Sequence, residues 1–447
     1  MQNATVFEFT SVKPAWDEKK ITFEYTVYFK YAQPQILHEE ILLPDSPFVV
    51  QHDSQAVVSA LQSLHLMLGV SYYKLYCPQT ITTPLYALSA QQVSFWDTVY
   101  TKGLGEFFYK NNIDFRGLVK FPLSTHPPKI VHGYHKKSGK SLVLLGGGKD
   151  SLVSGELLKK NGIDITAFFS HPIQKKSLEV LQIPGLQFSR KIDPQLTTLN
   201  ALPYTQNGHI PITAILSFLG ILCAVLYGYD NIILSNERSA NYGNTSYLGE
   251  EINHQWSKSI ECEMLMSEYV SNYICSHLRY FSLLRPFYEA KIVEIFSKFP
   301  QYFPVFVSCN RNFTQGNTGS KKWCGSCPKC AFVFALLSAY VPKNILVEIF
   351  GKDLYDDVSL LQTFKELLGI VNVKPFECVG TPDETKVAMH SAYSWGEYEQ
   401  TPVMSYFIDE VLPSLDTIEM LRSEVLSYGD DTNIPDEFKK IVKEYAH

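Results

Sequence analysis

The sequence has no excess of basic residues: 39 Lys and Arg stand against 45 Asp and Glu, which gives a net charge of −6. General attraction to nucleic acid or to an anionic membrane needs a positive protein surface, so neither partner is expected. Charged residues are also scarce, at 19% of the chain against 45% hydrophobic residues. This balance excludes a disordered chain and predicts folded domains with large cores.

A secretory signal is also missing from the first residues, MQNATVFEFTSVKP, where no basic segment precedes an apolar one. The uncharged run IPITAILSFLGILCAVLYGY, residues 210–229, is long enough to span a bilayer. It lacks Trp, Lys and Arg anchors and continues into the strand-like NIILS, so we expect a helix buried on a sheet. Nine cysteines without a secretory signal indicate the reducing cytoplasm.

No internal repeat or low-complexity tract is present, and 447 residues favour two or three domains. The strand-like ITFEYTVYFKY and the helix-like SAQQVSFWDTVYTKGLGEFFYKN, which contains a glycine break, predict an N-terminal α+β unit over residues 1–130. A segment rich in Pro, His and Lys, STHPPKIVHGYHKKSGK, then leads to an α/β unit over residues 138–338. Charged, helix-periodic stretches such as VSLLQTFKELLGI predict a mostly helical third unit over residues 339–447.

The α/β unit is predicted from a repeated order of elements. An apolar strand at Ser141–Leu145 is followed by a glycine loop, a helix from Ser151 and the strand IDITAFFS. The apolar helix of residues 210–229 and the strand NIILS repeat this order. Because such crossovers connect parallel strands, we expect a parallel sheet with both faces covered.

The glycine loop lies in LVLLGGGKDSLVSGELLKK, which lacks the Gly-x-x-x-x-Gly-Lys-Ser/Thr spacing of the common nucleotide-binding loop. A glycine turn before a helix exposes backbone N–H groups where the helix dipole favours an anion. Lys149 and Ser151 can add donors, and Asp150 can hold Mg²⁺ against phosphates. We therefore expect the loop to bind phosphate through Gly146, Gly147, Gly148, Lys149, Asp150 and Ser151.

These six residues resemble the Ser-Gly-Gly-x-Asp-Ser motif of the PP-loop ATP pyrophosphatases, with Gly146 in place of the first serine. The resemblance implies a doubly wound parallel sheet and cleavage of ATP between its α and β phosphates. AMP is transferred to an oxygen of the substrate while the loop retains pyrophosphate. The missing serine leaves open a protein that senses nucleotides or acts as a scaffold through a decayed loop.

Four cysteines cluster in CNRNFTQGNTGSKKWCGSCPKC, at Cys309, Cys324, Cys327 and Cys330. Overlapping C-x-x-C steps place three thiolates on one turn, and Cys309 can supply the fourth ligand of a closed tetrahedral site. This pattern predicts a structural zinc ion that folds the loop. An iron–sulfur cluster is the alternative, and a redox-active pair is less favoured because three cysteines share the turn.

A PP-loop followed by four cysteines resembles the deazaguanine nitrile synthases, but four local stretches resemble the MurL epimerases. They are SNERSANYGN, EEINHQWSKSIECE, WCGSCPKCAFVF and KPFECVGTPDETKVA. That family inverts the terminal L-Glu of UDP-N-acetylmuramoyl-L-alanyl-L-glutamate in peptidoglycan synthesis. The resemblance implies ATP and Mg²⁺ as requirements, AMP and diphosphate as products, and a small-molecule substrate. A PP-loop enzyme that modifies a nucleoside or tRNA is the alternative.

The implied chemistry has a physical reason. The glutamate nitrogen is part of an amide, so pyridoxal phosphate cannot form a Schiff base with it. A free carboxylate opposes loss of the neighbouring α-proton because two negative charges would share a small volume. Adenylation removes that charge and makes the carbonyl electron-withdrawing, so a protein base can take the proton. Closure to an oxazolone would acidify the α-carbon further.

Ligand-binding residues are expected where strands end. Asn236, Glu237 and Arg238 follow NIILS at its carboxyl end, where doubly wound sheets bind ligands. We expect Asn236 to bind ATP, Glu237 to help hold Mg²⁺ and Arg238 to bind a phosphate or carboxylate. Ser170, the last residue of IDITAFFS, is also expected at the ATP site. The MurL resemblance adds Asn241, His254, Ser257 and Lys258 as substrate-binding residues.

The base that removes the α-proton is not identified by the sequence. Cys378 stands outside the cysteine cluster, and a cysteine serves as a base when its pKa is lowered. Glu384, His390 and Lys258 compete for the role. The oligomeric state is also left open. The residues expected to be catalytic are Lys149, Asp150, Glu237, Arg238, Lys258, Cys378 and Glu384.

Overall fold

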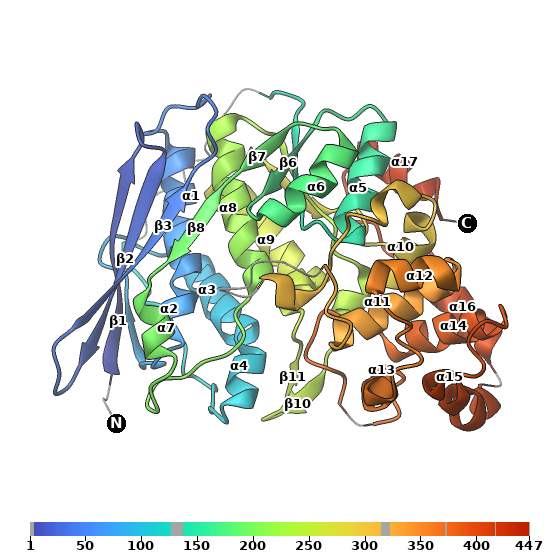
Figure 1. Ribbon diagram of the computed structural model, residues 1–447. Coiled ribbons are helices and arrows are strands. Elements are labelled where there is room, and N and C mark those ends of the chain that lie inside the picture. Colours follow the sequence, from blue (N-terminus) through green and yellow to red (C-terminus); the bar gives the residue numbers. More distant parts are fainter. Residues whose placement is uncertain (1–3, 127–136, 314–321, 372, 416, 447) are drawn as a thin grey trace.

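The structure is a computed structural model that describes residues 4–126, 137–313, 322–371, 373–415 and 417–446. It is a mixed α/β architecture with three regions side by side (Figure 1). The blue N-terminal sheet lies at one end, a parallel sheet with its helices lies in the middle, and the orange and red helices lie at the other end.

The N-terminal sheet has the strand order β4-β1-β2-β3-β8. Its neighbours are antiparallel except β1 and β4, which are parallel. The strand predicted at ITFEYTVYFKY is present as β2, whereas β1 and β3 were not predicted. Segment β8 comes from the range predicted as the second unit, so this sheet joins two of the predicted units. Its strands are β1 (Ala4–Ala15), β2 (Lys20–Phe29), β3 (Gln35–Leu42), β4 (Thr80–Thr82) and β8 (Ser189–Ile192).

Helices pack beside this sheet and reach the centre of the molecule. Helix α3 begins with a reciprocal cap in which the Ser89 hydroxyl accepts from the Gln92 N–H and the Gln92 side chain accepts from the Ser89 N–H. The predicted glycine break is confirmed, because α3 ends at Gly103 and α4 begins at Gly105. The helices of this region are α1 (Gln55–Leu68), α2 (Val70–Tyr73), α3 (Ala90–Gly103) and α4 (Gly105–Lys110).

The central sheet is parallel throughout, as expected, with the strand order β12-β9-β5-β6-β7. The chain moves outward from β5 through β6 to β7 and then returns to β9 on the other side of β5. The residues that follow β5 and β9 therefore leave the sheet next to each other at one edge. The strands are β5 (Ser141–Leu144), β6 (Ile165–Phe169), β7 (Gly185–Gln187), β9 (Asn231–Leu234) and β12 (Arg279–Ser282).

This sheet separates two hydrophobic cores, because alternate strand residues face opposite sides. Leu142 and Ile232 belong to the core shared with the N-terminal helices. Val143 and Ile233 belong to the core shared with the C-terminal helices. Helix α8 (Ile212–Tyr227) covers the first face and packs on α1, while α5 (Lys149–Lys160) covers the second. Both faces are covered, which explains why the strands are continuous apolar runs.

Helix α8 is the uncharged run, and it is buried against the sheet as predicted. Within the described ranges, no helix has the length and apolar character that crossing a membrane requires.

The chain after residue 340 is mostly helical, as expected. Helix α11 packs on α10, α12, α13 and α14, and α17 returns to contact α5 of the central region. The proposed boundary at residue 130 lies outside the described residues, and those at 138 and 338 remain predictions. The helices here are α10 (Glu289–Phe296), α11 (Pro328–Ser338), α12 (Lys343–Phe350), α13 (Leu361–Leu367), α14 (Pro382–Tyr393), α15 (Pro402–Tyr406), α16 (Ile418–Val425) and α17 (Asp436–Lys443).

Shorter elements complete the fold. They are α6 (Pro172–Leu181), α7 (Gln195–Leu199), α9 (Ile260–Tyr273), the β10–β11 hairpin (Thr245–Tyr247 and Glu250–Ile252), the 3₁₀ helices η1 (Arg238–Asn241), η2 (Trp256–Lys258), η3 (Pro300–Tyr302), η4 (Asn310–Phe313), η5 (Val358–Leu360) and η7 (Leu412–Ser414), and the π-turn η6 (Phe407–Val411). Two of them, η1 and η2, contain residues that were predicted from the sequence to bind the substrate.

Candidate active site

The glycine loop connects β5 to the first turn of α5, as the sequence predicts. Gly147 has φ = +79°, in the left-handed region that favours glycine. A Cβ atom at Gly148 would lie 2.6 Å from the Ser308 Oγ, so a side chain does not fit there without movement. A Cβ atom at Gly146 meets nothing within 4 Å. The position where PP-loops carry serine therefore has room for one.

Behind the loop lies a buried group of lysines and carboxylates. The ammonium of Lys149, which has no exposed surface, contacts Asp150 and lies 2.5 Å from the Glu289 carboxylate. Lys329 lies 3.2 Å from the other Glu289 oxygen. Burial raises the pKa of Glu289, but Lys149 and Lys329 outweigh it and lower that pKa to about 2. The positive charge behind the loop is thus held in place by a carboxylate that stays ionised.

Ser151 and Ser170 both lie close to the loop. The Ser151 hydroxyl donates to the Gly148 carbonyl at 3.1 Å. The Ser170 N–H donates to the Gln174 side chain at 3.0 Å, and the Gln174 amide donates to the Gly146 carbonyl at 3.3 Å. The structure therefore brings the end of β6 to the loop. Binding of ATP there stays a prediction.

The segment after β9 lies at the same edge of the sheet. Asn236 and Glu237 are buried, and the Glu237 Oε1 has no hydrogen-bond partner among the described residues. Arg285 donates to the Glu237 carbonyl at 2.8 Å and to the Lys258 carbonyl at 2.7 Å. Arg285 is itself buried in an ion pair with Glu263. One arginine thereby fixes Glu237 and Lys258 relative to each other.

A thiol, an imidazole and a carboxylate form a chain of contacts beside Lys258. The Cys378 Sγ lies 3.8 Å from the His254 Nε2, and the His254 Nδ1 contacts the Glu106 carboxylate. Cys378 is in the segment before α14, His254 lies between β11 and η2, and Glu106 is on α4. Three segments far apart in the sequence thus meet at one point. This is the arrangement that activates a thiol for proton transfer or nucleophilic attack.

The charges of this group support each other. Burial alone would raise the pKa of the Cys378 thiol, but Lys258 and His254 outweigh it and lower the pKa to about 7. Burial would lower the pKa of His254, but contacts with Cys378 and Glu106 raise it to about 9. Between these values the thiol is a thiolate and the imidazole is protonated.

Lys258 connects the thiol to the glycine loop. It is partly buried, and although burial opposes its charge, nearby anions hold its pKa above the usual value. These anions are Cys378, then Glu237, Glu289 and Asp150. Since Asp150 belongs to the loop and Cys378 to the thiol group, Lys258 lies within electrostatic reach of both. The loop and the thiol therefore both act on the charge of Lys258.

Two candidate bases lie in other surroundings. The Glu384 carboxylate accepts hydrogen bonds from the Ser239 hydroxyl at 2.9 Å, from the Ala290 N–H at 2.9 Å and from the Thr381 N–H at 2.7 Å. These bonds cap α14 and tie it to α10, which favours a structural role. His390 contacts Arg422 at 3.3 Å, on α16. Neither is in the chain of contacts around Cys378.

Two clefts lie near the predicted substrate-binding residues. The first, about 570 Å³, is lined by Asn241, Asn253 and Trp256, and His254 and the buried Ser257 are neighbours in sequence of the last two. The second, about 490 Å³, is lined by Tyr242 and by Lys374 and Thr381, and the last two flank Cys378 in sequence.

Arg238 borders the second cleft instead of facing the loop. It pairs with Glu424 at 3.0 Å and stacks on Tyr288, 4.5 Å from the ring centre. Both partners line that cleft. The side chain of Arg238 is therefore held by two residues of this cleft.

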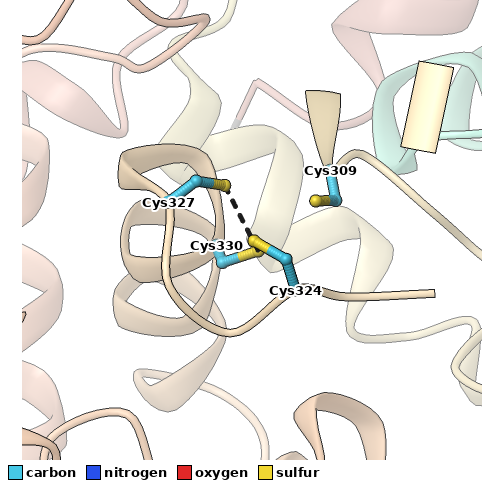
Figure 2. A group of neighbouring side chains, drawn as sticks. All are labelled: Cys309, Cys324, Cys327 and Cys330. Atoms are coloured by element: carbon cyan, nitrogen blue, oxygen red, sulfur yellow. Dashed lines mark hydrogen bonds between the residues drawn. The ribbon is translucent and has the colours of Figure 1, made fainter. Parts of the chain in front are cut away.

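The four clustered cysteines converge as predicted (Figure 2). Their ligand atoms all lie within 4.8 Å of one another. Cys330 Sγ is 3.6 Å from Cys324 Sγ and 3.5 Å from Cys327 Sγ. Disulfides need about 2.05 Å, whereas tetrahedral zinc with bonds of about 2.3 Å separates its sulfurs by about 3.8 Å. The cluster is therefore able to bind zinc. Helix α11 begins within the cluster, and its Lys329 pairs with Glu289.

Several residues of the site were not predicted from the sequence: Glu106, His209, Glu289, Lys329 and Lys374. Lys329 has a local signal, since it lies inside the C-P-K-C step of the cysteine cluster. Glu106 has none, because 148 residues separate it from His254.

The fold and the site define an α/β protein with an acid–base pair beside a glycine loop. Family models described as the MurL N-terminal domain and the MurL C-terminal domain match residues 1–283 and 305–420. The chain belongs to the MurL family.

Curated relatives cover most of the chain, and each is named UDP-N-acetyl-alpha-D-muramoyl-L-alanyl-L-glutamate epimerase. The relative from Xanthomonas oryzae pv. oryzae is 37% identical over 414 residues, covering 92% of this chain and 91% of its own. The relative from Micromonospora sp. is 36% identical over 402 residues, covering 88% and 89%. The relative from Salinispora tropica is 38% identical over 357 residues, covering 78% and 77%. No solved structure matches the chain.

Proposed function

We propose that this protein is an ATP- and Mg²⁺-dependent isomerase that inverts the terminal L-Glu of UDP-MurNAc-L-Ala-L-Glu. It proceeds through an acyl adenylate and releases AMP and diphosphate, in the cytoplasm. The names of the relatives supply the substrate. The observation that carries the mechanism is the position of Lys258, which lies within electrostatic reach of both Asp150 and Cys378. Activation and proton transfer then take place in one site.

The ATP site is the glycine loop of a doubly wound PP-loop domain, in this proposal. The strand order supports it, because β5 and β9 lie where the order of the sheet reverses, and ligands bind at such points. The start of α5 offers backbone N–H groups to phosphate. Ser151, Ser170 and Asn236 complete the pocket. Asp150 and Glu237 are the ligands for Mg²⁺, and the unpartnered Glu237 Oε1 fits that role.

Adenylation prepares the substrate for loss of its α-proton. A carboxylate oxygen of the terminal Glu attacks the α-phosphorus of ATP, and pyrophosphate leaves. The substrate carboxylate loses its negative charge in this step, so a carbanion can form beside it. The buried lysines behind the loop, Lys149 and Lys329, favour negative charge on the phosphates.

Cys378 is the base in this proposal. Its thiolate takes the α-proton, and Lys258 returns a proton to the opposite face. Lys258 suits this part because its ammonium is kept protonated and it lies within electrostatic reach of both the thiol and the loop. Water then attacks the acyl carbon, AMP leaves, and the D-Glu carboxylate is free. An oxazolone formed from the adenylate would pass through the same two proton transfers.

The cysteine cluster is a structural zinc site in this proposal, not a catalytic one. Four sulfurs leave no open position for a substrate or water. Its contribution is to hold the start of α11, and therefore Lys329, against Glu289.

An isotope experiment tests the proposal. The substrate carries ¹⁸O in the α-carboxylate, and the reaction is run in D₂O. The attacking oxygen bridges to AMP and stays there after cleavage at the acyl carbon, so AMP should contain ¹⁸O. The D-Glu product should contain deuterium at the α-carbon. Unlabelled AMP would exclude the acyl adenylate, and a product without α-deuterium would exclude epimerisation by exchange with solvent.

A further inference from the structure

Glu106 is the one carboxylate in contact with the His254 imidazole among the described residues. Its side chain is only 5% exposed, and its two oxygens have different partners. One oxygen contacts the His254 Nδ1, and the other lies 2.6 Å from the ammonium of Lys110, one turn along α4. The position of the carboxylate is therefore fixed by His254 on one oxygen and by Lys110 on the other.

We infer that Glu106 is a positioning residue that orients His254 toward Cys378, an inference that rests on the proposed function. A carboxylate that accepts the Nδ1–H of an imidazole fixes the ring and leaves Nε2 to face its second partner. In this site the second partner is the Cys378 Sγ, 3.8 Å from Nε2. Glu106 has no contact with the thiol itself, so it acts through His254.

The residues around Glu106 and His254 favour an ionised Glu106 and a protonated His254. The ring of His209 lies 4.4 Å from the ring of His254, and its Nδ1 is 3.7 Å from the Glu106 carboxylate. Burial lowers the pKa of His209 to about 3, so it is neutral and does not compete for the carboxylate's charge. Burial would raise the pKa of Glu106, but His254 outweighs it and lowers the pKa to about 2. The proton of the pair therefore stays on His254.

The other charges around the thiol come from different elements. Lys258 reaches it from η2 and Lys329 from α11, while Lys374 lies in the segment before it. None of these lysines is on α4. Removal of the Glu106 charge should therefore reach the thiol only through the protonation and orientation of His254.

The N-terminal region contributes a residue to the site. Helix α4 lies within residues 1–130, which contain no catalytic motif, yet its Glu106 completes a chain that ends at Cys378 of the C-terminal region. The site is complete only when both regions are packed together. Glu106 is the third member of a thiol–imidazole–carboxylate series, after Cys378 and His254.

The test measures the thiol in the full-length, metal-loaded enzyme without substrate. Iodoacetamide alkylates thiolates, and peptide mass spectrometry reads the rate at Cys378 separately from the other cysteines. The wild-type rate should rise with a midpoint near pH 7. In Glu106→Gln the midpoint should move up by about one unit, because the imidazolium that stabilises the thiolate is lost. Glu106→Asp keeps the charge and should lie in between.

The matched control is Glu24→Gln. Glu24 also accepts from a histidine, since the His38 Nε2 lies 3.0 Å away, but this pair is on β2 and β3. Its profile should equal that of the wild type. If Glu106→Gln does not fold, Glu106→Asp carries the test, because a shorter carboxylate that fails to move the midpoint would overturn the inference.

Catalysis supplies the second readout. α-Proton exchange at pH 7 should fall about 5-fold or more in Glu106→Gln, which is the loss of thiolate that a one-unit rise of the pKa causes at that pH, while labelled AMP still forms. An unchanged alkylation profile in Glu106→Gln would overturn the inference and leave the proposed function standing. A shifted profile in an enzyme that never epimerises the substrate would support the pairing while the proposed function fails. The ligand atoms of Glu106, His209 and His254 lie within 4.8 Å of one another, a spacing that a metal ion also fits. A metal ion bound in addition to that of the cysteine cluster, and lost in His209→Asn, would overturn the inference.

Discussion

The Lys329 ammonium lies 3.2 Å from the Glu289 carboxylate, and this contact connects the cysteine cluster to the glycine loop. Glu289 in turn contacts Lys149 at the start of α5. Because Lys329 lies between two of the clustered cysteines, the geometry of the cluster sets the position of a charge near the loop. A structural metal site can affect phosphate binding in this way without touching a ligand.

Cys309→Ser should remove the metal and destabilise the protein. A structural site contributes to folding by several kcal/mol, so the unfolding temperature should fall by about 10 °C or more. Metal analysis of the purified protein and thermal unfolding check both effects. One zinc per chain without visible absorbance identifies the metal and excludes an iron–sulfur cluster. A soluble, active and metal-free variant would contradict the site.

Asp150→Asn should abolish ATP-dependent turnover, with a loss of about 100-fold or more, and leave the fold intact. The variant loses the proposed Mg²⁺ ligand, but Lys149 keeps its contact with Glu289. No buried lysine is therefore left without a partner. Release of AMP and diphosphate measures the activity, and thermal unfolding measures the fold. Near-normal activity would show that the phosphate-loop assignment is wrong.

Gly146→Ser should be tolerated, because a Cβ atom there meets nothing within 4 Å. The hydroxyl restores the donor that PP-loops carry, so the KM for ATP should stay equal or fall. Gly147→Ser is the matched control at the next residue. Its φ of +79° makes a side chain cost about 1–2 kcal/mol, and turnover should fall. Equal behaviour of the two variants would contradict the loop geometry.

Cys378→Ala should separate the two halves of the reaction. Adenylation does not use the thiol, so ¹⁸O should still appear in AMP, although the adenylate then hydrolyses without inversion. Deuterium should not enter the α-carbon above about 1% of the wild-type rate. Deuterium at a wild-type rate would exclude Cys378 as the base.

The rate of α-exchange should depend on pH with two limbs. Cys378 must lose its proton to act as a base, so the rate should rise through pH 7, where its thiol titrates. Above about pH 9 His254 loses its proton, and the charge pair that holds the thiolate in position is lost, so the rate should fall. Steady-state exchange in buffers from pH 5.5 to about 10 measures both limbs. A rate that does not change with pH over this whole range would contradict the pairing of Cys378 with His254.

Sequence alone determined the features that depend on neighbouring residues. The strand, glycine loop and helix from Ser141 onward follow from an apolar run, three glycines and a helix-forming segment in direct succession. The cysteine cluster is equally local, because three of its thiols lie within seven residues of the chain. The apolar helix α8 also follows from its composition. In these cases the backbone itself brings the interacting groups together.

Only the tertiary structure decided which titratable groups meet. Cys378, Glu384, His390 and Lys258 all competed for the role of base in the sequence, since each is a proton-transfer group without a local pattern. Folding places Glu384 in the cap of α14 and His390 beside Arg422, and it leaves Cys378 against His254. The pairing of α4 with the turn after β11 cannot be read from either segment. Contacts between distant segments depend on the packing of whole elements, and the pKa of a thiol depends on which charges that packing brings near it.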